Sequence, residues 1–321
     1  MDTKKKIFIL SENLTYLKNK WICDVFKEEF ESYVTSNKDC AYEIVDKPED
    51  SDIIWLLASW YVKKIPVQIL KSKYVISTIH HIDKTKYNEN KKMYQQIDDV
   101  TNRYHVICQS VYDDLRELTT KEIVCKNFWI NEKNYFHIDE KESLRQKYGI
   151  PLDKYVVGSF QRDSEGADLA IPKLSKGPDL LVKILDDMKL KGTDLFVVLS
   201  GWRRTYIINE LTKLGIPYVY NELVDITEIN ELYNCLDLYV VSSRVEGAPR
   251  SIVECGLAQT PIISTDVGIA TLILDKASIY DVTNCLSYTN AKPNVIFAYE
   301  STQKYVIENY MNEFIDGIFK M

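Results

Sequence analysis

Short apolar runs rich in β-branched residues alternate along the chain with amphipathic stretches. In the first part of the sequence these runs cover 7–10, 52–58, 73–79 and 104–108. Near-continuous apolar strands that alternate with helices are typical of a parallel sheet covered on both faces. The pattern therefore predicts a doubly wound α/β unit in the N-terminal part of the chain.

The second half of the chain repeats this pattern. Its strand-like runs cover 155–160, 194–200, 218–220, 236–242 and 261–265. The mixed-charge segment 128–150 is the expected linker, and a final helix over 302–320 places apolar residues on one face. We therefore expect an N-terminal lobe, 1–145, and a C-terminal lobe, 146–301, with a last helix, 302–321, that could pack back on the first lobe.

Composition narrows the class of protein. The chain has 321 residues and a net charge of −7, which argues against a nucleic-acid binder. No apolar run is long enough to span a membrane, and the N-terminal apolar run is too short for a signal peptide. The seven cysteines form no CxxC, and the four histidines have no metal-ligand spacing. These features predict a soluble, cytoplasmic protein of two domains with no metal site.

The most informative stretch runs from 236 to 270. Glu246 and Glu254 are separated by seven residues, and Gly247 and Pro249 follow the first of them. Proline at a first helical position predicts a helix N-terminus here, whose free N–H groups and dipole favour an anion such as a diphosphate. Read alone, two glutamates at this spacing are more simply solvated charges beside a turn.

The surrounding pattern changes that interpretation. The run strand–Ser-Ser-x-x-Glu-Gly-x-Pro-x-x-x-x-Glu, followed by Thr-Pro, a strand and Thr-Asp-x-Gly, resembles the donor-binding segment of retaining glycosyltransferases of the GT-B fold, more narrowly glycosyltransferase family 4 (glycosyl transferases group 1). Upstream, 156–162 resembles the strand that delivers the family's phosphate-binding arginine. Residues 176–181 resemble its Lys-Gly-x-x-x-Leu helix start. The resemblance implies two Rossmann-like lobes that face each other across a cleft.

The resemblance also implies roles for individual residues. Arg162 and Lys176 would neutralise the leaving diphosphate, with Lys173 as an alternative to Lys176. Glu246 would contact the transferred sugar and Glu254 the ribose. The remaining implied donor-binding positions are Gly158, Val224, Gly247, Arg250 and the backbone amides of Ser251 and Ile252.

The first lobe matches more loosely. Residues 78–83 resemble the family's strand that ends in a histidine near the reacting sugar, which makes His80 a catalytic candidate; a structural histidine is the alternative. Residues 11–13 lack the glycines that usually follow the first strand. Tyr233 and Asp237 are interpreted as structural.

The predicted function is thus a retaining, metal-independent hexosyltransferase without a cofactor. It would move a sugar from a nucleotide-sugar donor to a hydroxyl of a glycan, a lipid or another acceptor, in surface polysaccharide or glycan assembly. Stabilisation of the leaving group would fall to side chains and a helix terminus. Peripheral contact with a membrane is compatible with this function. The alternatives are a nucleotide-sugar epimerase of the same fold and a non-catalytic nucleotide-sugar binding protein.

Overall fold

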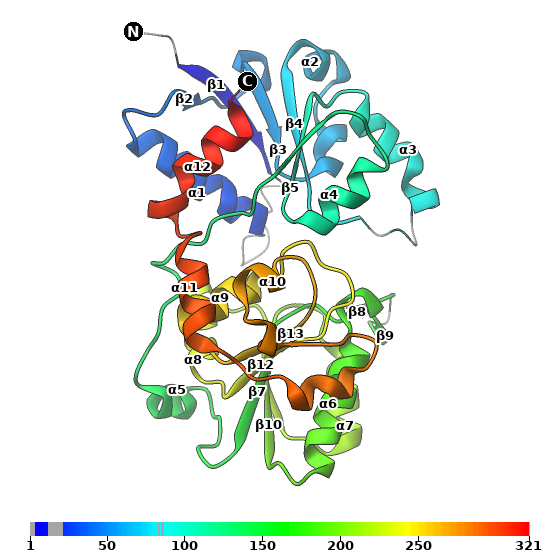
Figure 1. Ribbon diagram of the computed structural model, residues 1–321, viewed down its shortest axis with the longest axis vertical. Helices are drawn as coiled ribbons and strands as arrows, with labels where there is room; N and C mark the ends of the chain where they lie inside the picture. Colours follow the sequence, from blue (N-terminus) through cyan, green and yellow to red (C-terminus); the bar gives the residue numbers. More distant parts are fainter. Residues whose placement is uncertain (1–3, 12–21, 83, 85–86, 168, 321) are drawn as a thin grey trace. The chain divides into compact units, whose positions relative to one another are not determined.

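The chain folds into two compact units, described here from a computed structural model (Figure 1). The structure describes residues 4–11, 22–82, 84, 87–167 and 169–320. Unit 1 comprises 1–128 and 311–321, and unit 2 comprises 129–310. Positions 12 and 13 of the loop after the first strand lie outside the described residues.

Unit 1 is built on a parallel sheet with the strand order β2-β1-β3-β4-β5-β6. Its strands are β1 (Lys5–Leu10), β2 (Tyr42–Ile44), β3 (Ile53–Leu56), β4 (Tyr74–Ile79), β5 (Arg103–Val106) and β6 (Glu122–Cys125). Its helices are α1 (Ile22–Ser36), η1 (Pro48–Asp50), η2 (Ser59–Lys64), α2 (Val67–Ser72), α3 (Tyr87–Asp98), α4 (Gln109–Arg116) and most of α12 (Ile307–Phe319).

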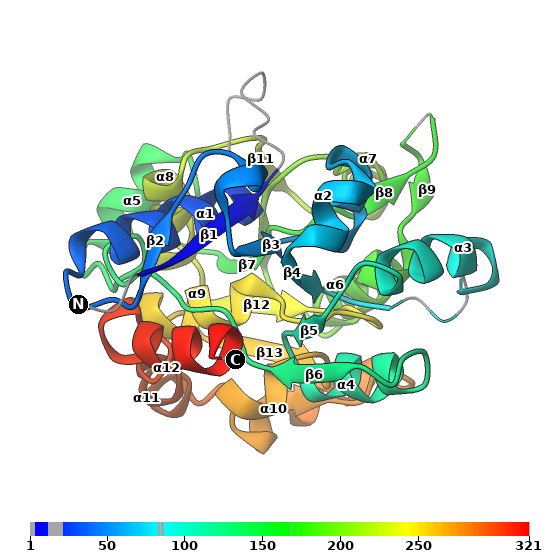
Figure 2. The same ribbon diagram turned by 90° about the horizontal axis from the view of Figure 1, so that it is seen from above.

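Aromatic side chains fill the core of unit 1. Trp55 of β3 is fully buried, and its ring centroid lies 5.2 Å from that of Phe30 in α1. Phe314 and Phe319 of α12 lie 5.9 and 5.3 Å from the same ring. The last helix of the chain therefore completes the core of unit 1, and Figures 1 and 2 show it beside α1.

Unit 2 contains a second parallel sheet, with the order β11-β10-β7-β12-β13-β14, and a small antiparallel pair, β8 and β9. Its strands are β7 (Tyr155–Ser159), β8 (Ser164–Glu165), β9 (Ile171–Pro172), β10 (Leu195–Ser200), β11 (Tyr218–Asn221), β12 (Leu238–Val241), β13 (Ile262–Thr265) and β14 (Ile279–Tyr280). Its helices are α5 (Lys141–Lys147), η4 (Leu174–Lys176), α6 (Pro178–Leu190), α7 (Thr205–Leu214), α8 (Ile226–Asn234), α9 (Arg250–Ala258), α10 (Ala270–Ile273), η5 (Lys276–Ser278), η6 (Cys285–Asn290) and α11 (Val295–Gln303). Figure 1 shows α6 and α7 on one side of this sheet and α8 and α9 on the other.

The unit boundary differs from the expected one near 145. The segment 128–150 does not act as a free linker, because its backbone and side chains are fastened to unit 2. The N–H groups of Phe136 and Ile138 donate to the side chains of Asn230 and Asn234 in α8. The boundary therefore lies at 128–129, and the final helix begins at 307 instead of 302.

Candidate functional site

The candidate site lies in unit 2, where β7 and β12 are neighbours. β7 is the first strand of this sheet in the chain, and it pairs with β10 on one side and β12 on the other. The loops after β7 and β12 therefore leave the sheet toward opposite faces. In open α/β sheets ligands bind at the carboxyl ends of the strands at such a switch point.

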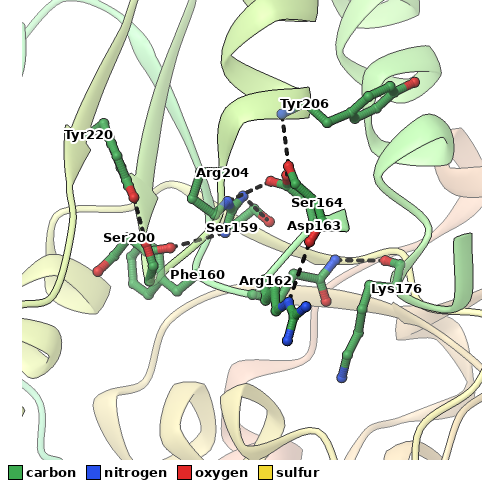
Figure 3. Close-up of polar contacts among 12 residues, drawn as sticks. Ser159, Phe160, Arg162, Asp163, Ser164, Lys176, Ser200, Arg204, Tyr206 and Tyr220 are labelled. Carbon is green, nitrogen blue, oxygen red and sulfur yellow. Dashed lines mark hydrogen bonds and ion pairs between the residues drawn. The ribbon is translucent and has the colours of Figure 1, made fainter. Parts of the chain in front are cut away.

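Two of the predicted cations lie together on the loop after β7. Arg162 is half-buried, and its Nε donates weakly to the Ser164 carbonyl at 3.3 Å. Lys176 ends η4, and its ammonium is ion-paired with Glu246 of the loop after β12. Figure 3 shows the side chains of Arg162 and Lys176 pointing to the same side of the loop. Burial lowers the pKa of Arg162, and the positive charge of nearby Arg203 lowers it further.

Lys173 belongs to the same cluster. It directly precedes η4 and is half-buried. Burial lowers its pKa, and the charges of Lys176 and Arg162 act in the same direction. The negative charges of Glu246 and Glu165 raise the pKa of Lys173 and so oppose this effect. The structure thus brings both alternative lysines close to Arg162. An anion bound here would be attracted by three cations.

Close backbone approaches fix this loop against β12. Gly177 has φ +62°, and a Cβ there would lie 1.8 Å from the Ser242 carbonyl oxygen. Only glycine satisfies both conditions. Gln161 adds a bridge, since its Nε2 donates to the Lys176 carbonyl at 2.7 Å and its Oε1 accepts from Ser243 Oγ at 3.2 Å.

A fully buried ion pair stabilises the loop after β7. Arg204 Nε lies 2.6 Å from Asp163 Oδ2, and the two side chains are 0% and 1% exposed. Arg204 also donates to the Ser200 carbonyl and to Ser159 Oγ at the ends of β10 and β7. Figure 3 shows Arg204, Asp163 and Ser159 next to Arg162. The pair therefore fixes the backbone that carries the phosphate-binding candidate.

Glu246 lies in the loop between β12 and α9. Besides Lys176, its Oε1 is 3.2 Å from Ser243 Oγ. Gly268, which follows β13, has φ +55°, and a Cβ there would lie 2.0 Å from the carbonyl oxygen of Gly247. The two glycine loops that the sequence singled out thus touch through their backbones, and this contact positions Glu246.

Glu254 lies one turn into α9 and is buried, with 8% of its surface exposed. Its Oε2 accepts a hydrogen bond of 2.7 Å from Tyr233, and its Oε1 lies 3.7 Å from Arg250 Nε. Arg250 also donates to the Trp129 carbonyl at 2.7 Å. The Tyr233 hydroxyl, interpreted from the sequence as structural, therefore orients one of the two motif glutamates.

The start of α9 is one of the predicted anion sites. Pro249 precedes the first helical residue, Arg250. The N–H of Ile252 donates to the Pro249 carbonyl at 3.1 Å, so this amide is engaged in the first turn. Ser251, between Arg250 and Ile252, lies in this first turn at the carboxyl edge of the sheet.

Two further predicted donor positions have different surroundings. Gly158 lies inside β7, where a Cβ would meet the Leu236 side chain at 2.2 Å, so packing accounts for this glycine. Val224 lies half-buried in the short loop between β11 and α8.

His80 belongs to unit 1 and directly follows β4. Its Nε2 is 2.7 Å from the Leu57 carbonyl, which fixes the proton on this nitrogen. Burial lowers its pKa to about 4. Its ring also stacks on Phe128 at 5.8 Å. The side chain is therefore a neutral imidazole at pH 7.

Sequence reasoning missed several supporting residues. These are Gln161, Asp163, Arg203, Arg204 and Ser243. The scarcity of arginine, with eight in the chain, was the one available signal for Arg203 and Arg204. Within the described ranges, no three His, Cys, Asp or Glu side chains are grouped so that they could hold a metal ion. No helix among the described elements has the length and apolarity needed to cross a membrane.

Residues 140–279 match the family model described as glycosyl transferases group 1. No curated protein sequence matches the chain. Among solved structures, Anabaena HepE in complex with UDP and glucose aligns with a TM-score of 0.75 at 12% identity, over 99% of this chain and 100% of that one. HepE in complex with UDP-glucose gives 0.72 at 13% identity, over 97% and 99% of the two chains.

A third structure, sucrose-phosphate synthase from Thermosynechococcus elongatus, aligns with a TM-score of 0.66 at 14% identity, over 96% of this chain and 82% of that one. The fold is therefore the GT-B fold, as predicted. The family match covers the segment that carries Arg162, Lys176, Glu246 and Glu254. Fold alone does not determine activity, so function must be argued from the site.

Proposed function

We propose that this protein is a glycosyltransferase that transfers a hexosyl group from a nucleotide-sugar donor to a hydroxyl acceptor with retention of the anomeric configuration. The observation that carries the proposal is the convergence of Arg162, Lys173 and Lys176 beside Glu246 at the carboxyl edge of β7. Clustered cations of this kind suit a group that leaves with two phosphates.

The proposed chemistry needs stabilisation of the departing diphosphate. Preorganised cations aimed at developing negative charge are among the strongest contributions to a transfer rate. Arg162 and Lys176 would bind the phosphate oxygens, and Glu246, released from Lys176, would accept hydrogen bonds from the sugar hydroxyls. No metal ion is required in this scheme, and the leaving phosphate would assist front-side attack by the acceptor.

Glu254 is proposed to hold the ribose through its Oε1, because Oε2 already accepts from Tyr233. The amide of Ser251 at the start of α9 would add to the phosphate site. We propose a glycan or lipid hydroxyl as the acceptor and surface-glycan assembly as the pathway; the resemblance of the motifs supports both.

The test begins with donor binding. UDP-, GDP- and dTDP-sugars are screened by thermal shift, because a ligand at a hundred times its Kd stabilises the folded state by about 2.7 kcal/mol. HepE, a structural neighbour, is known with UDP-glucose, which places UDP-glucose first in the screen. The donor with the largest shift is then incubated with acceptors, with and without EDTA, and the anomeric configuration of the product is read by NMR.

Two variants with matched controls test the site. Arg162→Ala and Lys176→Ala should each lower transfer at least 100-fold without unfolding the protein. Arg116→Ala and Lys213→Ala remove similar side chains outside the site and should leave transfer unchanged. Undiminished transfer by both site variants would refute the assignment. Conversion of the donor alone would indicate an epimerase, and binding without any conversion would indicate a non-catalytic binding protein.

A further inference from the structure

The turn after β10 has an unusual backbone. Arg203 has φ +59°, in the left-handed region that side chains other than glycine seldom adopt. A strained residue of this kind persists only where its surroundings fix it, and such residues cluster at functional sites. Leu169 and Gln259 share this conformation, so a role for Arg203 must be argued from its surroundings.

The surroundings of Arg203 tie it to the phosphate site. Its carbonyl accepts the N–H groups of Asp163 and Ser164 at 3.3 and 3.1 Å. The next residue, Arg204, is the buried partner of Asp163. The turn after β10 is therefore fastened to the loop that carries Arg162, and the two arginines keep a fixed relation to each other.

Among the residues that the structure describes, no acidic side chain forms an ion pair with the half-buried Arg203. Its guanidinium carbon lies 4.3 Å from the ring centroid of Trp202, which is 46% exposed. Within the described part of the chain, the buried Arg203 Nε has no hydrogen-bond acceptor. Trp202 thus holds the guanidinium by a cation–π contact, which uses none of its N–H donors.

Charge around the site is unbalanced. Burial lowers the pKa of Arg162, the positive charge of Arg203 lowers it further, and the negative charge of Glu165 acts in the opposite sense. Burial and the charge of Arg162 also lower the pKa of Lys173, which Glu165 again opposes. Glu246 is already paired with Lys176. Arg162, Lys173 and Arg203 therefore outnumber the one further carboxylate that acts on this cluster, Glu165, and a bound polyanion would relieve the remaining repulsion.

We propose that Arg203 is a third phosphate-binding cation, which contacts the donor diphosphate together with Arg162 and is held in position by the left-handed turn and the Trp202 ring. This inference rests on the proposed function, because a nucleoside diphosphate is the polyanion expected there. Arginine suits the role because its planar guanidinium can bind two phosphate oxygens at once.

The variant Arg203→Gly separates side chain from backbone. Glycine adopts the left-handed conformation without strain, so the turn and the fold should persist while the guanidinium is lost. The thermal midpoint should stay at or above that of the wild type. Arg116→Gln is the matched control, since Arg116 also lies over an aromatic ring, that of Tyr112, but on α4 of unit 1.

Affinities are measured by calorimetry with UDP, GDP and dTDP and, by competition, with the corresponding nucleosides. Arg203→Gly should lower the affinity for the nucleoside diphosphate roughly 10- to 100-fold, as expected for a lost charge-assisted hydrogen bond. Affinity for the nucleoside should change less than two- to threefold. Arg116→Gln should change neither.

The outcomes separate the two proposals. Wild-type protein that binds none of the three diphosphates would overturn the proposed function and this inference with it. Wild-type binding that Arg203→Gly leaves intact would overturn only the role of Arg203. An equal loss of diphosphate and nucleoside affinity would also overturn it, because the turn would then act through shape and not through phosphate contact.

Discussion

The buried ion pair of Asp163 and Arg204 allows the loss of folding stability in a variant to be predicted. Asp163→Asn keeps the shape of the side chain but leaves the Arg204 guanidinium buried without a counter-charge. At the 2.6 Å separation of Nε and Oδ2, the Coulomb attraction is about 6 kcal/mol for an effective dielectric constant of about 20. Much of this offsets desolvation, and breaking one side of a buried pair typically costs about 3–5 kcal/mol.

The remaining hydrogen bonds of Arg204, to the Ser200 carbonyl and Ser159 Oγ, satisfy donors but do not neutralise the charge. We therefore expect Asp163→Asn to lower the free energy of unfolding of unit 2 by about 3–5 kcal/mol. For a unit of this size the midpoint should fall by roughly 6–20 °C. Urea and thermal unfolding followed by tryptophan fluorescence and circular dichroism measure both quantities.

Two controls isolate the pair. Glu210→Gln breaks an exposed pair with Lys213 and should change stability by no more than about 1 kcal/mol. The double variant Asp163→Leu with Arg204→Met should recover most of the loss, since an apolar replacement removes both buried charges. If Asp163→Asn lowered the free energy of unfolding by less than about 1 kcal/mol, the reasoning would be refuted, because a buried Arg204 without its counter-charge should cost more.

Two further results are expected. Gly177→Ala should destabilise the protein by several kcal/mol, because its Cβ would meet the Ser242 carbonyl, whereas Gly149→Ala, at a similar φ with no atom within 4 Å, should cost only about 1 kcal/mol; equal losses in urea titrations would contradict this. Burial lowers the pKa of His80 to about 4 and of His105 to about 3, so the unfolded chain binds more protons than the folded one below pH 6.5. Each histidine should therefore reduce the stability of unit 1 by about 2 kcal/mol between pH 7 and pH 5. A His105→Gln variant that kept the full pH dependence would contradict this assignment.

Much of the fold could be predicted because the strands of a covered parallel sheet are apolar on both faces. The runs at 73–79 and 194–200 agree with β4 and β10 to within a residue at either end. The short edge strands β2, β6 and β14 were missed, since two to four residues that are only partly buried carry little pattern. The unit boundary was misplaced because the asparagine side chains of α8 that hold segment 128–150 give no local signal.

The site divides in the same way. Arg162, Lys176 and Glu246 could be chosen as candidates from the sequence because each lies in a recognisable local motif beside a strand end. The partners that position them come from other loops, and no spacing rule links Asp163 to Arg204 or Gln161 to Ser243. The left-handed backbone of Arg203 was equally hidden, because it is imposed by hydrogen bonds from a different loop.

The contacts that hold these loops together also explain why the site needs only a few glycines. Gly177 and Gly268 allow one loop to touch the next through backbone atoms, and the buried Asp163–Arg204 pair joins a third loop to them. Each contact links loops from different strands, so the position of a cation on one loop depends on all of them. Like charges held together in this way store repulsion that a bound anion releases, and the rigidity of the loops keeps that repulsion from relaxing by side-chain separation. The cations of the proposed phosphate site thus all belong to unit 2.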